Sequence, residues 1–241
     1  MNINIITIYP NYFVSALNSG LLKKAIEKNI INISVINLRD FAVNSNGKVD
    51  DSPYGGGSGM VLMVEPIYKA LKHINKKEKT YSILLSAAGE IYNQQKARFF
   101  SNLLDKGNKD NKDKFESLTI VCGNFEGVDQ RVSDYLVDEE ISAGKFVLSG
   151  GEPAALLLID SLARLLPGFM GNPDSLKDES YNESNYLEYP QYTRPEIFLD
   201  MKTPDVLLSG NHENIKQWRK EKSLKKSLKR ASKVSDELPK Q

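Results

Sequence analysis

The sequence has little of the chemistry from which disulfide and metal sites are built. Its 241 residues include one cysteine and two histidines, which excludes an internal disulfide and a zinc cluster of cysteine or histidine ligands. It also lacks the ~18 to 20 consecutive apolar residues of a membrane span, and its N-terminus has no secretory signal. We therefore expect a cytoplasmic protein with no membrane partner and no such metal site.

An excess of charge of either sign is also lacking, since the net charge is +1, but the charges are unevenly distributed. The segment 216–233 holds nine lysines or arginines against one acid, Glu221. The spacing predicts a helix with Trp218, Leu224 and Leu228 near one face and cations around the rest. The sequence leaves open whether this helix binds nucleic acid or is a solvated terminus.

Strands and helices are predicted to alternate along the first 170 residues. Short apolar, β-branched runs predict strands at 3–8, 30–38, 81–86, 118–122 and 146–148. Apolar residues at three-to-four spacing predict helices at 13–29, 60–74, 93–104 and 154–166. The predicted fold is α/β, with a parallel sheet in a domain spanning 1–170, a polar flexible linker at 171–186 and a small helical domain at 187–241.

Glycine-bearing loops are the most visible motifs. The loop 50–60 has four glycines but is not a Walker loop, because no Lys-Ser/Thr follows the last glycine. The loops 86–89, 122–129 and 142–152 lie at the ends of predicted strands, and in a parallel sheet such loops can meet at one ligand crevice. Cys122 is a conceivable nucleophile, but its apolar strand favours a buried core residue.

Five motifs occur in order along almost the whole chain. They are Pro53-Tyr54-Gly55-Gly56-Gly57-Ser58-Gly59-Met60, Cys122-Gly123-Asn124-Phe125-Glu126-Gly127-Val128-Asp129, Val147-Leu148-Ser149-Gly150-Gly151-Glu152, Tyr192-Thr193-Arg194-Pro195 and Leu207-Leu208-Ser209-Gly210-Asn211-His212. Together they resemble the bacterial tRNA (guanine-N1)-methyltransferases of the SPOUT class. The resemblance implies a deep trefoil knot in the first domain and a homodimer with a composite site. It departs from the usual pattern at Ala87-Ala88 and Pro153.

The resemblance implies methyl transfer from S-adenosyl-L-methionine to N1 of the guanine immediately 3′ of the anticodon, position 37 of tRNA. It places the cofactor at Leu85, Ser86, Gly89, Gly123, Phe125, Glu126, Ala143, Gly144, Lys145, Phe146, Val147, Leu148, Gly150 and Gly151. It places tRNA contacts at Tyr54, Gly55, Gly59 and Arg194, and the basic helix adds Lys220, Lys222, Lys225 and Lys226. It assigns no metal ligand, although a divalent cation, Mg²⁺, is implied in turnover. A DNA partner is not expected.

Removing the N1 proton requires a base, and a cation near O6 would stabilise the charge that develops there. The resemblance gives these roles to Glu179 and Arg164, with Asp178 beside the base position. Without it, Arg164 reads as a cation at a helix C-terminus and Glu179 as a solvated acid. Two alternatives remain: a SPOUT methyltransferase for another RNA nucleotide, and a non-catalytic nucleotide- and RNA-binding module that would have no use for this pair.

Overall fold

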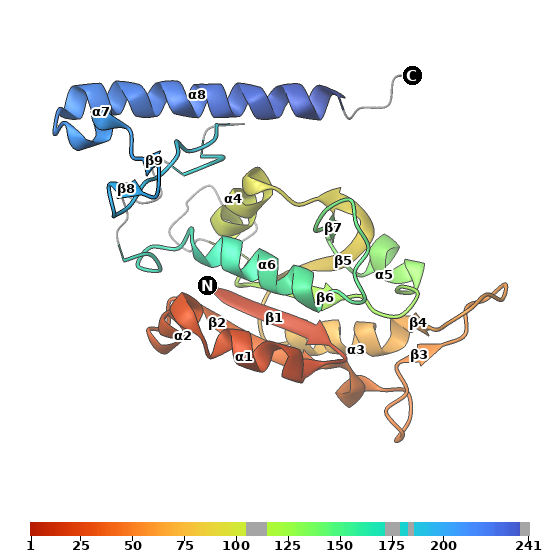
Figure 1. Cartoon of the computed structure of the whole chain (residues 1–241). Coiled ribbons are helices and arrows are strands. Elements are labelled where there is room, and N and C mark those ends of the chain that lie inside the picture. Colours follow the sequence, from red (N-terminus) through yellow and green to blue (C-terminus); the bar gives the residue numbers. More distant parts are fainter. Residues whose placement is uncertain (105–114, 172–178, 183–185, 237–241) are drawn as a thin grey trace. The chain divides into compact units, whose positions relative to one another are not determined.

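The computed structural model describes residues 1–104, 115–171, 179–182 and 186–236. These residues form two compact units, Met1–Gly171 and Asn172–Gln241. The first is an α/β unit built around one sheet, and the second consists of short strands and helices (Figure 1). The roles that the sequence gives to the two domains stay predictions.

The sheet of the first unit has five parallel strands in the order β2-β1-β6-β5-β7. Their bounds are β1 Asn2–Thr7, β2 Asn32–Asn37, β5 Thr80–Ile91, β6 Ser117–Cys122 and β7 Glu139–Ser142. In register, Ile5 of β1 pairs with Val35 on one side and Ile120 on the other. Strand β6 is buried throughout, because it lies at the centre of the sheet between two helical layers.

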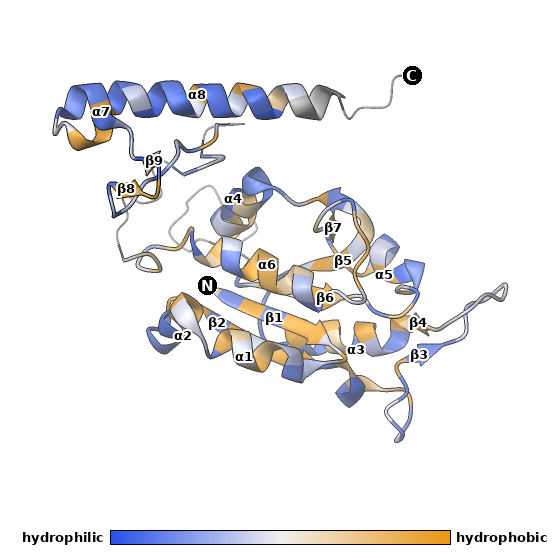
Figure 2. Ribbon diagram, viewed as in Figure 1, coloured by the Kyte–Doolittle hydropathy of each residue, from blue (hydrophilic) through white to orange (hydrophobic). Residues whose placement is uncertain are grey.

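Helices cover both faces of this sheet. One layer contains the 3-10 helix η1 Pro10–Phe13 and the helices α1 Val14–Leu17, α2 Gly20–Glu27, α4 Gln94–Leu103 and α6 Glu152–Ala163. The other contains η2 Leu38–Phe41, α3 Val64–Asn75 and α5 Gln130–Tyr135. Figure 2 shows α6 coloured mainly as hydrophobic. The predicted α/β class with a parallel sheet is confirmed.

Three predicted elements differ in the structure. The predicted strand at 146–148 is wrong, because these residues form a loop with Val147 88% exposed, and the strand nearby is β7. The helix expected from Met60 begins at Val64, since Val61–Leu62 (β4) pairs with Asp50–Asp51 (β3). The helix expected over 13–29 is interrupted before α2, which begins at a glycine with a φ of 62°.

The second unit contains the hairpin of β8 Ile197–Phe198 and β9 Met201–Lys202, then α7 Asp205–Leu208 and α8 His212–Asp236. Ser223 of α8 is fully buried, and Ser227 Oγ accepts a hydrogen bond from the Leu187 amide at 2.9 Å. Leu224 is 60% exposed, whereas Trp218 is half-buried. The predicted common apolar face is therefore wrong: six residues turn an α-helix through about 600°, which leaves these two side chains about 120° apart.

Candidate active site

A cavity of about 360 Å³ lies where β6 and β7 end and α6 begins, with the middle of β5 along one side. Such crevices at the carboxyl ends of parallel strands are the usual ligand sites of α/β sheets. Eleven of the fourteen predicted cofactor residues line it: Leu85, Ser86, Gly123, Phe125, Glu126, Ala143, Phe146, Val147, Leu148, Gly150 and Gly151. Three segments far apart in the sequence thus form one pocket, although the first of them, expected to be a loop at 86–89, lies within strand β5.

The loops after β6 and before α6 are joined through their backbones. The Gly151 amide donates a hydrogen bond to the Gly123 carbonyl at 2.8 Å, and Asn124 forms an isolated antiparallel bridge with Gly150. A β-carbon on Gly151 would lie 2.8 Å from the Cα of Cys122, so only glycine allows this approach. This close contact defines one wall of the pocket.

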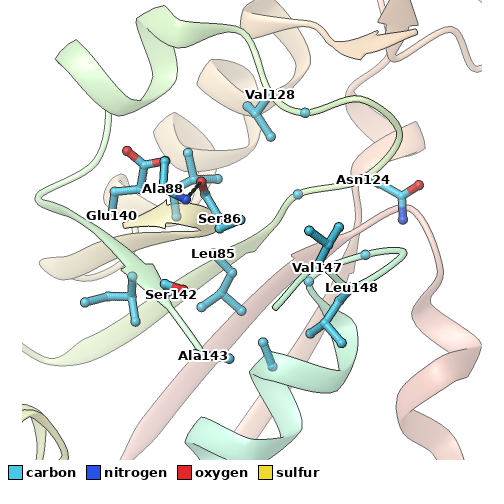
Figure 3. A pocket seen from close by; sticks show the side chains of 18 of the residues that line it. Leu85, Ser86, Ala88, Asn124, Val128, Glu140, Ser142, Ala143, Val147 and Leu148 are labelled. Carbon is cyan, nitrogen blue, oxygen red and sulfur yellow. Dashed lines mark hydrogen bonds between the residues drawn. The ribbon is translucent and has the colours of Figure 1, made fainter. Parts of the chain in front are cut away.

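The opposite wall is contributed by β5 and β7. Figure 3 shows Val147 and Leu148 on one side, with Ser86, Ala88 and Glu140 on the other. The Ser86 hydroxyl accepts a hydrogen bond from the Ala88 amide at 3.0 Å, and the Glu140 carboxylate accepts one from Ser133 Oγ at 2.6 Å. The pocket therefore combines apolar side chains with fixed backbone and carboxylate groups.

The charged side chains that line the pocket are of one sign. Among the residues that line it in the described part of the chain, Glu126 and Glu140 are acidic and none is lysine or arginine. Anionic groups such as the phosphates of a nucleotide would find no cationic side chain there. A ligand with an apolar ring and a positive charge fits this lining better.

Gly89, Gly144 and Lys145 were predicted at the pocket but do not line it. A β-carbon on Gly89 would lie 2.5 Å from the Ile141 amide nitrogen, so this glycine lets β5 approach β7. Lys145 is exposed. Sequence reasoning missed lining residues on α5 and β7, namely Gln130, Ser133, Glu140 and Ile141, because neither element had been predicted.

Cys122 is a core residue, as its apolar strand suggested. It is 2% exposed, and burial raises the pKa of its thiol well above the ordinary value, with the charge of Glu152 adding to this effect. The thiolate form is therefore disfavoured, and a nucleophilic role is not supported.

The glycine loop at 53–59 reaches the same region. The Glu126 amide donates a hydrogen bond to the Met60 carbonyl at 3.0 Å. Gly59 has a φ of 78°, and a β-carbon there would overlap the Glu126 side chain. Tyr54, near the tip of the loop, is fully exposed. Two of the five motifs thus meet beside the pocket.

The comparison with known proteins decides the family. The family described as tRNA (Guanine-1)-methyltransferase TrmD matches residues 1–237. The chain belongs to this tRNA (guanine-1)-methyltransferase family. Among its relatives, the tRNA (guanine-N(1)-)-methyltransferase of Carboxydothermus hydrogenoformans is 47% identical over 95% of this chain and 85% of its own. The proteins of that name from Dictyoglomus turgidum and Geobacillus kaustophilus are 47% and 44% identical, over 87% and 93% of their own lengths.

The two residues that the family resemblance marks as catalytic lie in different units. Arg164 is half-buried at the C-terminus of α6 in the first unit. Glu179 is half-buried in the second, where its carbonyl accepts a hydrogen bond from the Asn182 amide at 3.2 Å. Asp178, the neighbouring candidate, lies outside the described residues. The roles of this pair in methyl transfer stay predictions.

The basic residues of α8 divide into two groups. Lys222 lies 5.5 Å from the Trp218 ring, and Lys226 Nζ donates a hydrogen bond to the Glu188 carbonyl at 3.1 Å. Lys220 and Lys225 are exposed. Arg194, the remaining predicted tRNA contact, is also exposed, in the segment before β8.

None of the described helices is long and apolar enough to cross a membrane. In the described ranges, no three histidine, cysteine, aspartate or glutamate side chains gather into a metal site. The divalent cation implied by the resemblance therefore has no supporting geometry here.

Proposed function

We propose that this protein transfers a methyl group from S-adenosyl-L-methionine to N1 of the guanine at position 37 of tRNA, immediately 3′ of the anticodon. The observation that carries this proposal is the pocket, which the family's own motifs build and whose lining is apolar and acidic. The relatives' names support tRNA and guanine N1 as the target. They do not favour either alternative, a different RNA nucleotide or a non-catalytic binder.

The residues present fit S-adenosylmethionine. The apolar walls of Leu85, Val147 and Leu148 suit an adenine ring, and the backbone groups of the glycine loops suit its nitrogens. The carboxylates of Glu126 and Glu140 suit the positive charge of the molecule. When bound, the cofactor supplies an electrophilic methyl group on its sulfonium.

Glu179 is the proposed base. Guanine N1 carries a proton at neutral pH, and its lone pair attacks only after that proton has left. In this proposal Glu179 accepts the N1 proton, and the guanidinium of Arg164 faces O6, where negative charge develops. Methyl transfer then forms the N1–carbon bond and breaks the sulfur–carbon bond, whose electron pair stays on sulfur.

A homodimer with a composite site is the proposed assembly. It is supported by apolar side chains that are exposed beside the pocket, with Phe146 at 54% and Val147 at 88%. Helix α6 is apolar nearly all round, and Leu157 on its outer side is 46% exposed. Helices of this kind are normally buried on every side, which a second copy of the chain would achieve.

The trefoil knot belongs to the same proposal. It rests on the family to which the chain belongs. The second unit is the proposed tRNA-binding domain, and its proposed RNA contacts are Arg194 and the α8 lysines. Tyr54, Gly55 and Gly59 of the first unit are proposed to contact the same tRNA. A tRNA substrate implies work in the cytoplasm.

Nucleoside analysis tests the function. Unmodified tRNA is incubated with the protein and labelled S-adenosylmethionine, then digested and separated. We expect 1-methylguanosine at position 37 and no product from a matched tRNA carrying adenine there. Methylation at another nucleotide would support the first alternative, and RNA binding without methylation would support the second.

A further inference from the structure

The outer side of α3 is an exposed basic surface that the methylation site does not use. Between Pro66 and Lys77 the sequence has no acidic residue. The residues Lys69, Lys72, His73, Lys76 and Lys77 are exposed and form what we call the α3 basic face. The opposite side of the helix is buried in the core through Ile67, Ala70, Leu71 and Ile74.

Most of this charge is not neutralised within the described residues. Lys69 forms an ion pair with Glu65 at 2.7 Å, one turn earlier in the helix. Lys72 instead lies over the exposed ring of Tyr68, 5.5 Å from its centroid. Lys76 and Lys77 have no carboxylate within ion-pair distance in the described part of the chain.

The surface beside the lysines is hollowed. Two shallow cavities, each of about 460 Å³, share Asp40, Phe41 and His73, and lysines of the α3 basic face line both. The rings of Phe41 and His73 lie 5.6 Å apart. Lysines interleaved with exposed rings suit nucleic acid, which offers phosphates and stacking surfaces together.

Stabilisation of the helix dipole explains only part of this pattern. Cations are favourable in the last turn of a helix, where Lys72 and His73 lie. The dipole effect falls off within that turn. The basic face extends from Lys69, before the last turn, to Lys77, beyond the helix C-cap at Lys76.

We propose that the α3 basic face binds the phosphate backbone of the tRNA substrate at a place distant from the methylated base. Helix α3 leads into β5, and the stretch from Thr80 to Leu85 of that strand separates the C-terminal end of the face from the pocket by about 17 Å. A contact there would orient an elongated polyanion without touching the reacting nucleotide. Because it presupposes tRNA, this contact rests on the proposed function.

The test compares two triple variants of the full chain. One is K72A/K76A/K77A, and the control is K23A/K24A/K28A, which removes three exposed lysines around α2. Dissociation constants for tRNA are measured by fluorescence anisotropy over a series of salt concentrations. We expect the α3 triple to lower the slope of log K against log salt by about 2, since each phosphate contact contributes about 0.7 to 0.9. The control should keep the slope, and both should keep cofactor affinity.

Several outcomes would overturn this contact. An unchanged slope in the α3 triple would do so, as would an equal loss in the control, which would indicate only a change in net charge. Weaker binding of an acidic peptide with unchanged tRNA binding would assign the face to a protein partner instead. Failure of the wild type to form 1-methylguanosine, with the slope still lowered in the α3 triple, would reject the proposed function and leave the RNA contact standing.

Discussion

Thr7 Oγ1 donates a hydrogen bond to Glu152 Oε1 at 2.6 Å, which joins the end of β1 to the first residue of α6. Thr7 is fully buried and Glu152 is 2% exposed, the one buried acid among the described residues. A carboxylate at a helix N-terminus is stabilised by the helix dipole, but burial makes each lost hydrogen bond costly. This pair therefore holds α6 in place directly behind the pocket.

Replacing Thr7 by valine keeps the shape and removes the donor. We expect Thr7→Val to lower the free energy of unfolding by about 1–3 kcal/mol, because the buried Glu152 carboxylate loses its partner. Thr7→Ser keeps a hydroxyl and should recover most of the stability. Urea unfolding measures both, and equal midpoints for Thr7→Val and wild type would contradict the role given to this bond.

Gly151→Ala should weaken S-adenosylmethionine binding. The added β-carbon would lie 2.8 Å from the Cys122 Cα and 3.0 Å from the Gly123 nitrogen, so backbone must move. Overpacking of this kind costs about 1–3 kcal/mol, which corresponds to about 5- to 150-fold in affinity if the whole cost falls on the cofactor-bound state. Calorimetry measures the affinity. Gly171→Ala, with nothing within 4 Å, is the control, and equal affinities in the two variants would count against this pocket.

The Cys122 thiol should be slow to react. Its raised pKa keeps it protonated, whereas an unfolded cysteine ionises near pH 8.5. Near pH 8.5 only the unfolded chain loses the thiol proton, so the free energy of unfolding should fall as the pH rises through about 8.5. A chromogenic disulfide reagent at pH 8 should label the native protein far more slowly than the protein in urea. Equal rates would show that the thiol is accessible.

The two groups of α8 lysines should differ in RNA binding. Lys220 and Lys225 are exposed, so Lys220→Ala with Lys225→Ala should lower the salt slope of tRNA binding by about 1.5. Lys222 and Lys226 are engaged with the Trp218 ring and the Glu188 carbonyl, so their double alanine variant should also lower the melting temperature. If neither variant changes the slope, α8 is a solvated helix.

The alternation of strands and helices could be predicted from residue type because the sheet is buried on both faces. The run from Ile3 to Ile8 is β-branched, and β1 occupies most of it. Strand β7 was missed because its sequence, Glu-Glu-Ile-Ser, has only one large apolar residue. The loop 146–148 has the composition of a strand but exposes its side chains, so its apolar residue types indicated the wrong structure.

The pocket could be predicted only through the glycine motifs. Local patterns mark Gly123 and Gly151 as turn residues, but nothing local reveals that their backbones pair across 28 positions. The same holds for Thr7 and Glu152, which are 145 residues apart. Long-range contacts of this kind are decided by the fold, and sequence periodicity reports only the face on which a residue lies.

Glu179→Gln is expected to slow methyl transfer itself. The amide cannot accept the N1 proton, and a general base contributes about 100- to 10,000-fold to the rate. S-adenosylmethionine affinity should hardly change, because Glu179 does not line the pocket. Arg164→Ala should also lower the rate, since it removes the cation that is proposed to face O6. Single-turnover methylation with saturating tRNA separates these effects from binding.

Asp178→Asn is the matched control for the base. The Glu side chain is longer than the Asp side chain by one methylene, so the two neighbouring carboxylates cannot both be placed correctly at N1. Misplacement of a base by ~1 Å can lower the rate by ~100-fold. We expect Asp178→Asn to keep most of the single-turnover rate and Glu179→Asp to recover little of it. A nearly normal Glu179→Gln enzyme beside an inactive Asp178→Asn enzyme would move the base by one residue. Normal rates in both would remove the base from this segment altogether.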